Sequence, residues 1–300
     1  MTTDNNLDSD QNTLKQLRAF LQNLPVIGSH FEDRPKGAVL RLSGVIMDSN
    51  RRNALSLTRL AKQIEKAFSK PGVVAVALAI NSPGGSAAQS SLIADEIRHW
   101  AEEKDIPVYA FVEDVAASGG YWLACAADEI YTQNVSIVGS IGVISAGFGL
   151  EDFIEKHDIH RRLYTAGHDK SMLDPFLPEK AEDIERLKTL QKDLHHCFID
   201  WVRERRGHML KASDHTLFEG RFWTAQTALE LGLIDGVRTM REFLTVKFGD
   251  RVKLLDITAE KRLLPQFLPF MQQGSFSAEG IGDELLQSIE AKALWARYGL

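Results

Sequence analysis

Cysteine is scarce in this sequence, and several other signals are missing from it. Cys125 and Cys197 are its two cysteines, and each lies in an apolar pattern of helical spacing, which predicts buried reduced thiols and leaves one disulfide open. No window approaches the run of about 18 apolar residues that a transmembrane helix needs. There is no dense lysine and arginine stripe and the formal net charge is −6, so nucleic acid is not an expected partner. We also expect neither a cofactor nor a metal.

The beginning of the chain lacks the apolar surface that would offset the entropy of ordering it. Residues 1–12 are polar and acidic, without the basic end and apolar stretch of a signal peptide. Leucine and phenylalanine at helical spacing over 13–24 predict a helical arm that docks on the protein, with a membrane-surface helix as the weaker alternative. The expected location is cytoplasmic, and peripheral contact with a membrane stays open. We assign residues 1–36 to this disordered start and N-terminal helical arm.

A folded α/β core is predicted over residues 37–258, since 44% hydrophobic and 25% charged residues are ordinary for a globular protein. The apolar run from Val73 to Ile80 is bounded by turn signals, which is typical of a buried parallel strand. A helix is predicted from about Ala88 to Glu103, and the next strand from Pro107 to Val112. Strand, turn and helix in repetition indicate a parallel sheet.

Apolar periodicity predicts further elements before and after this unit. Strands are predicted at 38–47, 129–132, 136–145, 161–165 and 252–257. Helices are predicted at 55–68, 121–127, 150–156, 184–206, 224–231 and 240–248. Residues 259–300 are predicted to form a linker and a C-terminal helix.

A serine followed by two glycines stands between the strand at 107–112 and an alanine-rich helix. Residues 114–121 read Asp-Val-Ala-Ala-Ser-Gly-Gly-Tyr. At such a turn, backbone N–H groups are unpaired and the helix dipole favours negative charge, while glycines let another chain approach closely. Ser118 is therefore a candidate nucleophile. From this segment alone, an N-cap of the following helix explains it equally well.

A second glycine-bearing turn, Ser-Pro-Gly-Gly-Ser at 82–86, follows the strand at 73–80. Turns after parallel strands emerge at the same edge of a sheet, where ligands bind, so the two turns should be neighbours. Gly85 would then donate its backbone N–H toward a carbonyl attacked by Ser118, with Gly119 as a second donor of an oxyanion hole. The segment has neither nucleotide-binding glycine pattern, which disfavours a phosphate cradle, whereas a plain tight turn stays open.

A serine hydroxyl needs a base, and one loop offers the candidates. His168 is the only one of nine histidines in a suitable setting, and Lys170 lies in the same loop beside apolar residues. A lysine has a pKa of about 10.4, so a neutral lysine base needs a dry cleft, and Asp169 and Asp174 would have to point away. Ser140 would hold the amine by a hydrogen bond. The simpler interpretations are an exposed loop lysine and a small residue in a tight bend.

Together these segments resemble the signal peptide peptidase A family of serine–lysine peptidases. The similarity extends over residues 37–236 and rests on the order and spacing of segments 79–86, 114–121, 139–143, 166–171, 220–224 and 228–235. Each segment alone is a weak signal, and their order and spacing together are a strong one.

The resemblance implies specific roles, a fold and an assembly. Ser118 would be the nucleophile and Lys170, 52 residues later, the general base; Ser140 would orient the lysine amine, and Gly85 would contribute to the oxyanion hole. The implied fold is a crotonase-like (Clp protease-like) α/β spiral of repeated ββα units, here with extra N- and C-terminal helices. A homo-oligomeric ring is also implied, in which the serine and the lysine can come from neighbouring subunits.

The implied function is an ATP-independent serine endopeptidase that acts on peptides. Typical members carry an N-terminal membrane anchor that this sequence is not expected to have, so the substrates expected are signal-peptide remnants or other short apolar-rich peptides. One alternative is a non-catalytic ring-forming scaffold that binds peptides. A less favoured alternative is a crotonase-type acyl-CoA enzyme, for which the expected glutamate at a glycine-rich turn is missing.

Overall fold

The computed structural model describes residues 34–49, 54–167, 169–258, 289 and 291–300. The strands are β1 (Lys36–Ser43), β2 (Val45–Ile46), β3 (Ala54–Leu55), β4 (Val73–Ser82), β5 (Val108–Ala117), β6 (Glu129–Thr132), β7 (Ile137–Gly139), β8 (Phe222–Thr224), β9 (Gly236–Val237) and β10 (Lys253–Asp256). The helices are α3 (Leu57–Ser69), α4 (Ala87–Lys104), α5 (Gly119–Ala124), α6 (Glu151–Lys156), α7 (Ala181–Arg206), α8 (Asp214–Leu217), α9 (Ala225–Leu231) and α10 (Met240–Phe248). The N-terminal helix predicted at 13–24 and most of the predicted C-terminal linker and helix lie outside the described residues.

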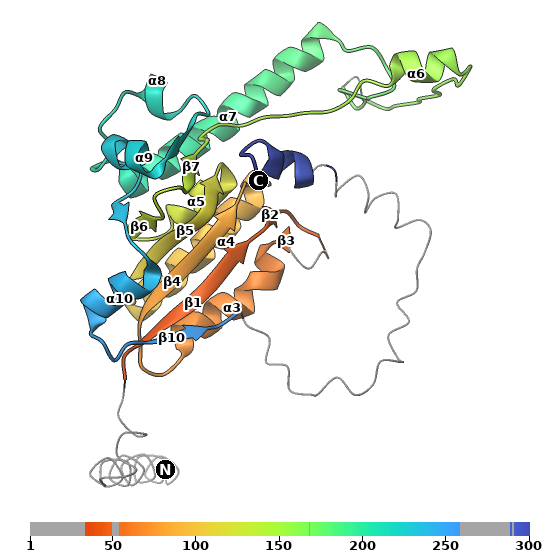
Figure 1. Ribbon diagram of the computed structural model, residues 1–300. Helices are drawn as coiled ribbons and strands as arrows, with labels where there is room; N and C mark the ends of the chain where they lie inside the picture. The colour runs from red at the N-terminus through yellow and green to blue at the C-terminus, as the bar shows by residue number, and fades with distance from the viewer. Residues whose placement is uncertain (1–33, 50–53, 168, 259–288, 290) are drawn as a thin grey trace, which may run out of the picture.

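The main sheet has eight strands and is mostly parallel (Figure 1). Its order is β10-β1-β4-β5-β6-β9, and every neighbouring pair in this row is parallel. Strand β7 continues beside β5 in parallel and pairs with β8 in the antiparallel sense. The predicted α/β class with a parallel sheet is therefore confirmed. The finer expectation of a crotonase-like spiral stays a prediction, and so does the division into residues 1–36, a core at 37–258 and residues 259–300.

Both faces of the sheet are covered, which is usual for parallel strands. Because successive side chains of a strand point to opposite faces, Val108 and Ala110 of β5 pack in the larger hydrophobic cluster, whereas Tyr109 and Phe111 pack in the smaller one. Helices α3, α4 and α5 cover the larger cluster, and α10 covers the smaller one with Phe243. The apolar run that predicted β4 therefore describes a strand buried on both faces.

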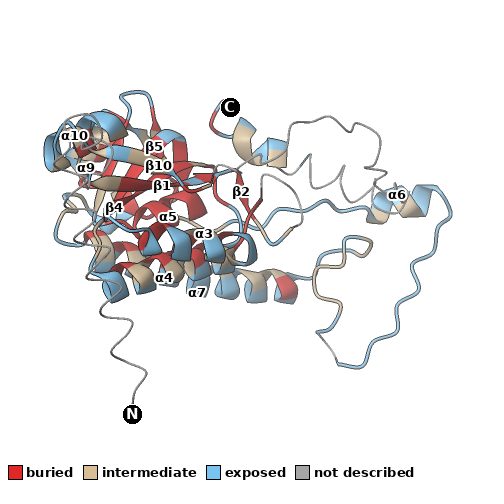
Figure 2. Cartoon of the chain, turned by 90° about the horizontal axis from the view of Figure 1, so that it is seen from below, coloured by how far each residue is buried: buried red, intermediate tan, exposed pale blue. Residues whose placement is uncertain are grey.

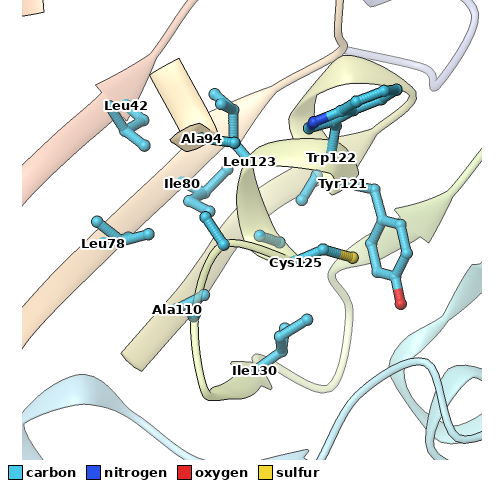
Figure 3. Close-up of a cluster of buried hydrophobic side chains, with 14 of the residues drawn as sticks. Leu42, Leu78, Ile80, Ala94, Ala110, Tyr121, Trp122, Leu123, Cys125 and Ile130 are labelled. Atoms are coloured by element: carbon cyan, nitrogen blue, oxygen red, sulfur yellow. The ribbon is translucent and has the colours of Figure 1, made fainter. Parts of the chain in front are cut away.

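The larger cluster joins the sheet to the short helix that follows Ser118. Figure 3 shows Leu78 and Ile80 of β4 gathered with Tyr121 and Leu123 of α5, and all four side chains are fully buried. The phenol of Tyr121 donates a hydrogen bond of 2.7 Å to the carbonyl oxygen of Leu233, so the polar end of this ring is satisfied as well. This packing fixes α5 over the ends of β4 and β5.

Three strand predictions differ from the structure. No strand forms at 161–165, where Arg161 pairs with Asp174 in the same loop. Strand β7 stops at Gly139 because Ser140 turns to a φ of 53°, outside strand geometry. Strand β5 extends to Ala117, beyond the predicted end at 112, since the charged side chains that interrupt its pattern pair with side chains of β1 and β4.

Residues 144–180, which we call the arm, project from the core and carry α6 (Figures 1 and 2). Many of its apolar side chains are exposed, among them Ile144, Phe148, Leu150, Phe153, Ile159, Leu163 and Tyr164. Leu190 and Leu194, on the part of α7 that follows, are exposed too. In the described part of the chain, no helix is long and apolar enough to cross a membrane.

The two cysteines have different environments, contrary to the expectation that both are buried. Cys125 is fully buried at the end of α5, and burial raises the pKa of its thiol to about 12. Cys197 is exposed on α7, and neither thiol forms a disulfide. The buried, rarely ionised thiol of Cys125 should therefore react slowly, because the thiolate is the nucleophile.

We therefore expect one thiol to react in the folded protein and two in denaturant. A chromogenic disulfide reagent at pH 8 should release about one equivalent of product, and mass spectrometry should place the modification at Cys197. The variant Cys197→Ser should lose this reaction. Rapid modification of Cys125 in the native state would contradict the packing described here.

A buried ion pair ties α7 to the loop before β9. Arg206 is 1% exposed and donates to the carboxylate of Asp235 at 2.7 Å and to the carbonyl oxygen of Gly232 at 3.1 Å. Asp235 also accepts from the backbone N–H of Ile130, so one carboxylate joins α7, β6 and the β9 loop. Removing one member of such a pair leaves the other charge buried and uncompensated.

We predict that Arg206→Ala lowers the free energy of unfolding by about 3–5 kcal/mol. Lys188→Ala is the matched control, because Lys188 pairs with Glu185 on the exposed face of the same helix and should cost less than about 1 kcal/mol. Urea denaturation followed by tryptophan fluorescence measures both. Equal midpoints for the two variants would contradict a stabilising role of the buried pair.

Candidate active site

Ser118 sits at a sharp strand-to-helix turn. Strand β5 ends at Ala117 and α5 begins at Gly119, so a single residue makes the change of direction. Its φ of 52° and ψ of −123° lie in a region that residues other than glycine rarely adopt, at a cost of about 1–3 kcal/mol. The side chain makes no capping hydrogen bond, so the alternative of a simple N-cap does not account for this serine. Its backbone N–H donates to the carbonyl oxygen of Gly139 at 2.8 Å.

The two glycine turns pack directly against each other, as the parallel arrangement of β4 and β5 predicts. A Cβ atom placed on Gly84 would lie 2.8 Å from Cβ of Ser118 and 2.9 Å from the backbone nitrogen of Gly119. A Cβ atom on Gly119 would meet Oγ of Ser90 at 2.4 Å and the backbone nitrogen of Gly85 at 3.4 Å. Side chains at these glycines would therefore push the two turns apart.

The backbone of Ile46 holds the first turn in place. Its N–H donates to the carbonyl oxygen of Gly84 at 2.9 Å, and its carbonyl oxygen accepts from the N–H of Ser86 at 2.7 Å. Gly85 lies between these two bonds, so its own N–H points away from Ile46. Within the described residues, the N–H groups of Gly85 and Gly119 donate to no protein acceptor, and such groups are suited to an oxyanion.

Ser118, Gly85 and Gly119 line one cavity of about 230 Å³. Its other lining residues are mostly apolar and come from the turn after β4, α4, α5, the chain after β7, α7 and residues 291–300: Pro83, Ala87, Trp122, Gly142, Val143, Ile144, Leu194, Phe198, Leu294 and Arg297. The rings of Trp122 and Phe198 stack with centroids 4.9 Å apart and form one wall. A hydroxyl beside two N–H donors and an apolar pocket can bind and attack a carbonyl group with an apolar substituent.

Ser140 lies next to this site but does not line the cavity. It follows Gly139, the residue that pairs with Ala117 of β5, and its N–H donates to the carbonyl oxygen of Arg221 at 2.6 Å. Its side chain is 6% exposed, and its Oγ accepts a hydrogen bond of 3.3 Å from the phenol of Tyr298. The structure therefore brings Ser140 beside the serine turn, with its hydroxyl already engaged.

Lys170 is not part of this cluster in the single chain. It lies exposed on the arm and is not among the residues that line the Ser118 cavity in the described part of the chain. The two nearby carboxylates engage arginines: Asp169 pairs with Arg186 at 2.6 Å and Asp174 with Arg161 at 2.9 Å. The N–H of Phe176 and the Arg161 guanidinium lower the pKa of Asp174. His168, the other candidate base, lies outside the described residues.

The sequence analysis missed several residues that build the site. Ile46 carried no signal, because its role depends on backbone atoms alone. Trp122 and Phe198 were visible only as helical core positions. Tyr298, Arg297 and Leu294 follow the linker after β10, and no spacing rule connects them with Ser118.

Several known proteins are similar to this chain. The family model described as peptidase family S49 matches residues 101–250. Over 270 residues, 87% of this chain, the sequence is 52% identical to a Brucella abortus protein named Na(+)/H(+) antiporter NhaA, of which the match covers 36%. It is 30% identical over 246 residues to the chloroplastic serine protease SPPA of Arabidopsis thaliana, covering 78% of this chain and 35% of that one.

A further relative is the putative signal peptide peptidase SppA of Enterococcus faecium, 30% identical over 203 residues, which are 66% of this chain and 58% of that protein. The chain thus spans between about a third and three fifths of the length of these relatives. The antiporter name belongs to a protein most of which lies outside the match.

The packing at Gly85 gives a prediction for stability and for the reactivity of Ser118. In Gly85→Ala, the new Cβ atom would lie 2.1 Å from the carbonyl oxygen of Ile46, and φ is 145°, so the turn must move. We expect the free energy of unfolding to fall by about 1–3 kcal/mol and the reaction of Ser118 with a fluorophosphonate probe to slow.

Gly147→Ala is the matched control, because nothing lies within 4 Å of a Cβ atom there and its φ is not positive. Its stability should stay within about 0.5 kcal/mol of the wild type. Urea denaturation and in-gel probe fluorescence measure the two effects. Wild-type stability and labelling in Gly85→Ala would contradict the geometry of the turn.

Proposed function

Because the chain belongs to peptidase family S49, the signal peptide peptidase A family, we propose that it is a serine peptidase that cleaves short apolar-rich peptides with Ser118 and Lys170. The observation that carries the proposal is the conformation of Ser118. A strained serine without a capping role, placed between a strand and a helix and facing a cavity, is the arrangement of an exposed nucleophile.

The proposed reaction proceeds through an acyl-enzyme. Oγ of Ser118 attacks the peptide carbonyl while the neutral amine of Lys170 accepts the hydroxyl proton. The N–H groups of Gly85 and Gly119 bind the oxyanion of the tetrahedral intermediate. Lys170 then gives its proton to the leaving amine as the C–N bond breaks. Water, deprotonated by the same amine, releases the acyl group and restores the serine hydroxyl.

The exposed arm supports delivery of the lysine by a second copy of the chain. Lys170 lies on a projecting segment whose apolar side chains are exposed in the single chain, and such a surface marks a protein interface. In a cyclic homo-oligomer, every arm can reach the serine of the next subunit. We therefore propose a homo-oligomeric ring with shared Ser118–Lys170 sites. We also propose that the core forms the crotonase-like spiral of repeated ββα units.

The cavity walls support an apolar substrate. Trp122, Phe198 and Leu194 face the space beside Ser118, so an apolar side chain next to the scissile bond would be buried there. Signal-peptide remnants are one source of such peptides, and no nucleotide is needed for their hydrolysis. We also propose that the protein works in the cytoplasm, with peripheral contact to a membrane.

A non-catalytic peptide-binding scaffold is the second candidate, favoured by the position of Lys170 in the single chain. The acyl-CoA alternative has less support, since no glutamate is among the residues that line the cavity in the described part of the chain. Peptide binding without hydrolysis by the assembled wild-type protein would select the scaffold.

We predict that Ser118→Ala and Lys170→Ala each lower kcat for a fluorogenic apolar peptide by at least about 10,000-fold. If the dyad is shared, dissociating, mixing and reassembling the two variants should restore activity. Where a Lys170→Ala subunit supplies the serine and a neighbouring Ser118→Ala subunit supplies the lysine, the site is complete. Random mixing places about one quarter of the sites in this state.

Lys188→Ala should keep wild-type kcat, since Lys188 is an exposed lysine that pairs with Glu185 away from the cavity. Light scattering shows whether each variant assembles like the wild type. Activity that persists in Lys170→Ala would remove the lysine from the mechanism, and probe labelling that survives Ser118→Ala would remove the serine. A mixture without activity would place both groups in one chain.

A further inference from the structure

The last ten residues of the chain lie against the serine site. Residues 291–296 are helical and residues 297–300 follow without a break. Figure 1 shows this segment near α5 and β2, and its residues Leu294 and Arg297 line the same cavity as Ser118. We call residues 291–300 the C-terminal segment.

Tyr298 anchors this segment to the core. Its side chain is 7% exposed, packs with the buried residues Val115 and Ala117 of β5, and meets the ring of Phe222 edge to face with centroids 5.2 Å apart. Trp295, one turn earlier, packs against the same small cluster. A tyrosine buried so well needs a partner for its hydroxyl.

That partner is the hydroxyl group of Ser140, at 3.3 Å. The family resemblance implies that the same hydroxyl orients the amine of Lys170 toward Ser118, and we carry this role into the proposed mechanism. Ser140 is 6% exposed, is absent from the cavity lining and already accepts the hydrogen bond from Tyr298, so an arriving amine finds this hydroxyl engaged. Tyr298 and Lys170 thus need the same position.

We propose that the C-terminal segment occupies the binding position of the Lys170 amine, with Tyr298 as the competing donor, and leaves it when the amine is delivered. The inference rests on the proposed function, since it concerns the same two serines. A phenol O–H and an amine N–H make hydrogen bonds of similar length to a hydroxyl oxygen, so one can replace the other. The segment belongs to the same chain, which gives it a high effective concentration at Ser140.

The competition has a consequence for the single chain. With Tyr298 on Ser140 and Lys170 on the exposed arm, the isolated subunit has a formed oxyanion site but no base. Assembly would bring an amine to each serine only together with displacement of the segment. An unassembled subunit would therefore not cleave peptides until assembly replaces the Tyr298–Ser140 contact with a Lys170–Ser140 contact.

The full-length variant Tyr298→Phe tests the competition, because it keeps the ring contacts with Phe222 and removes only the hydroxyl. We expect kcat to rise by about 2- to 10-fold, the range set by the loss of one hydrogen bond. Tyr131→Phe is the matched control: it removes a phenol that donates to Glu129 in the other hydrophobic cluster, and its kcat should equal the wild type. An unchanged or lower kcat in Tyr298→Phe overturns the inference.

Hydrogen–deuterium exchange gives a readout that needs no catalysis. In assembled Ser118→Ala protein, the amides of residues 291–300 should exchange faster than in the assembled double variant Ser118→Ala/Lys170→Ala, where no amine competes for Ser140. Equal exchange in the two proteins overturns the inference even if the wild type is an active peptidase. Faster exchange supports the competition even if no peptide is cleaved, an outcome that refutes only the proposed function.

Discussion

The parallel pairing of β4 with β5 is the constraint on which the candidate site depends. Ser82 of β4 pairs with Ala116 of β5, so the residues that follow both strands emerge side by side. A Cβ atom on Gly120 would lie 2.4 Å from the carbonyl oxygen of Ser82, which shows how closely α5 approaches the end of β4. The strain at Ser118 persists because strands buried on both faces hold the turn from each side.

The part of the site formed by Ser118, Gly85 and Gly119 could be predicted from the sequence because its signals are local. Apolar runs bounded by turn residues gave β4 and β5, and topology then required their turns to be neighbours. The glycines could be interpreted in the same way, since close backbone approach needs residues without a side chain. Chain direction and glycine placement together therefore led from the segment around Ser118 to the donors at Gly85 and Gly119.

The rest could not be predicted, because it depends on contacts that no local pattern contains. The hydrogen bond between Tyr298 and Ser140 joins residues 158 positions apart, across a linker with no periodic signal. The strand predicted at 161–165 failed for a related reason: its pattern was suitable, but in the part of the chain that the structure describes no strand pairs with residues 161–165. Extended conformation is stable where a partner strand accepts its backbone hydrogen bonds, and within the described residues, the segment 161–165 has no such partner strand.

The two halves of the site differ in how they are held. Ser118, Gly85 and Gly119 are fixed by the sheet and by the backbone of Ile46, so they are in place before any partner or substrate arrives. Lys170 lies on a segment with exposed apolar side chains and few contacts, and such segments have the lowest local stability in a fold. In the proposed mechanism, placing the electrophile-binding groups on the rigid half would preorganise the oxyanion site, where small displacements are costly. In the proposed mechanism, placing the base on the exposed half would let a second subunit decide when the serine becomes reactive. The hydroxyl of Ser140, which Tyr298 contacts in the single chain, would then accept the Lys170 amine in the assembly.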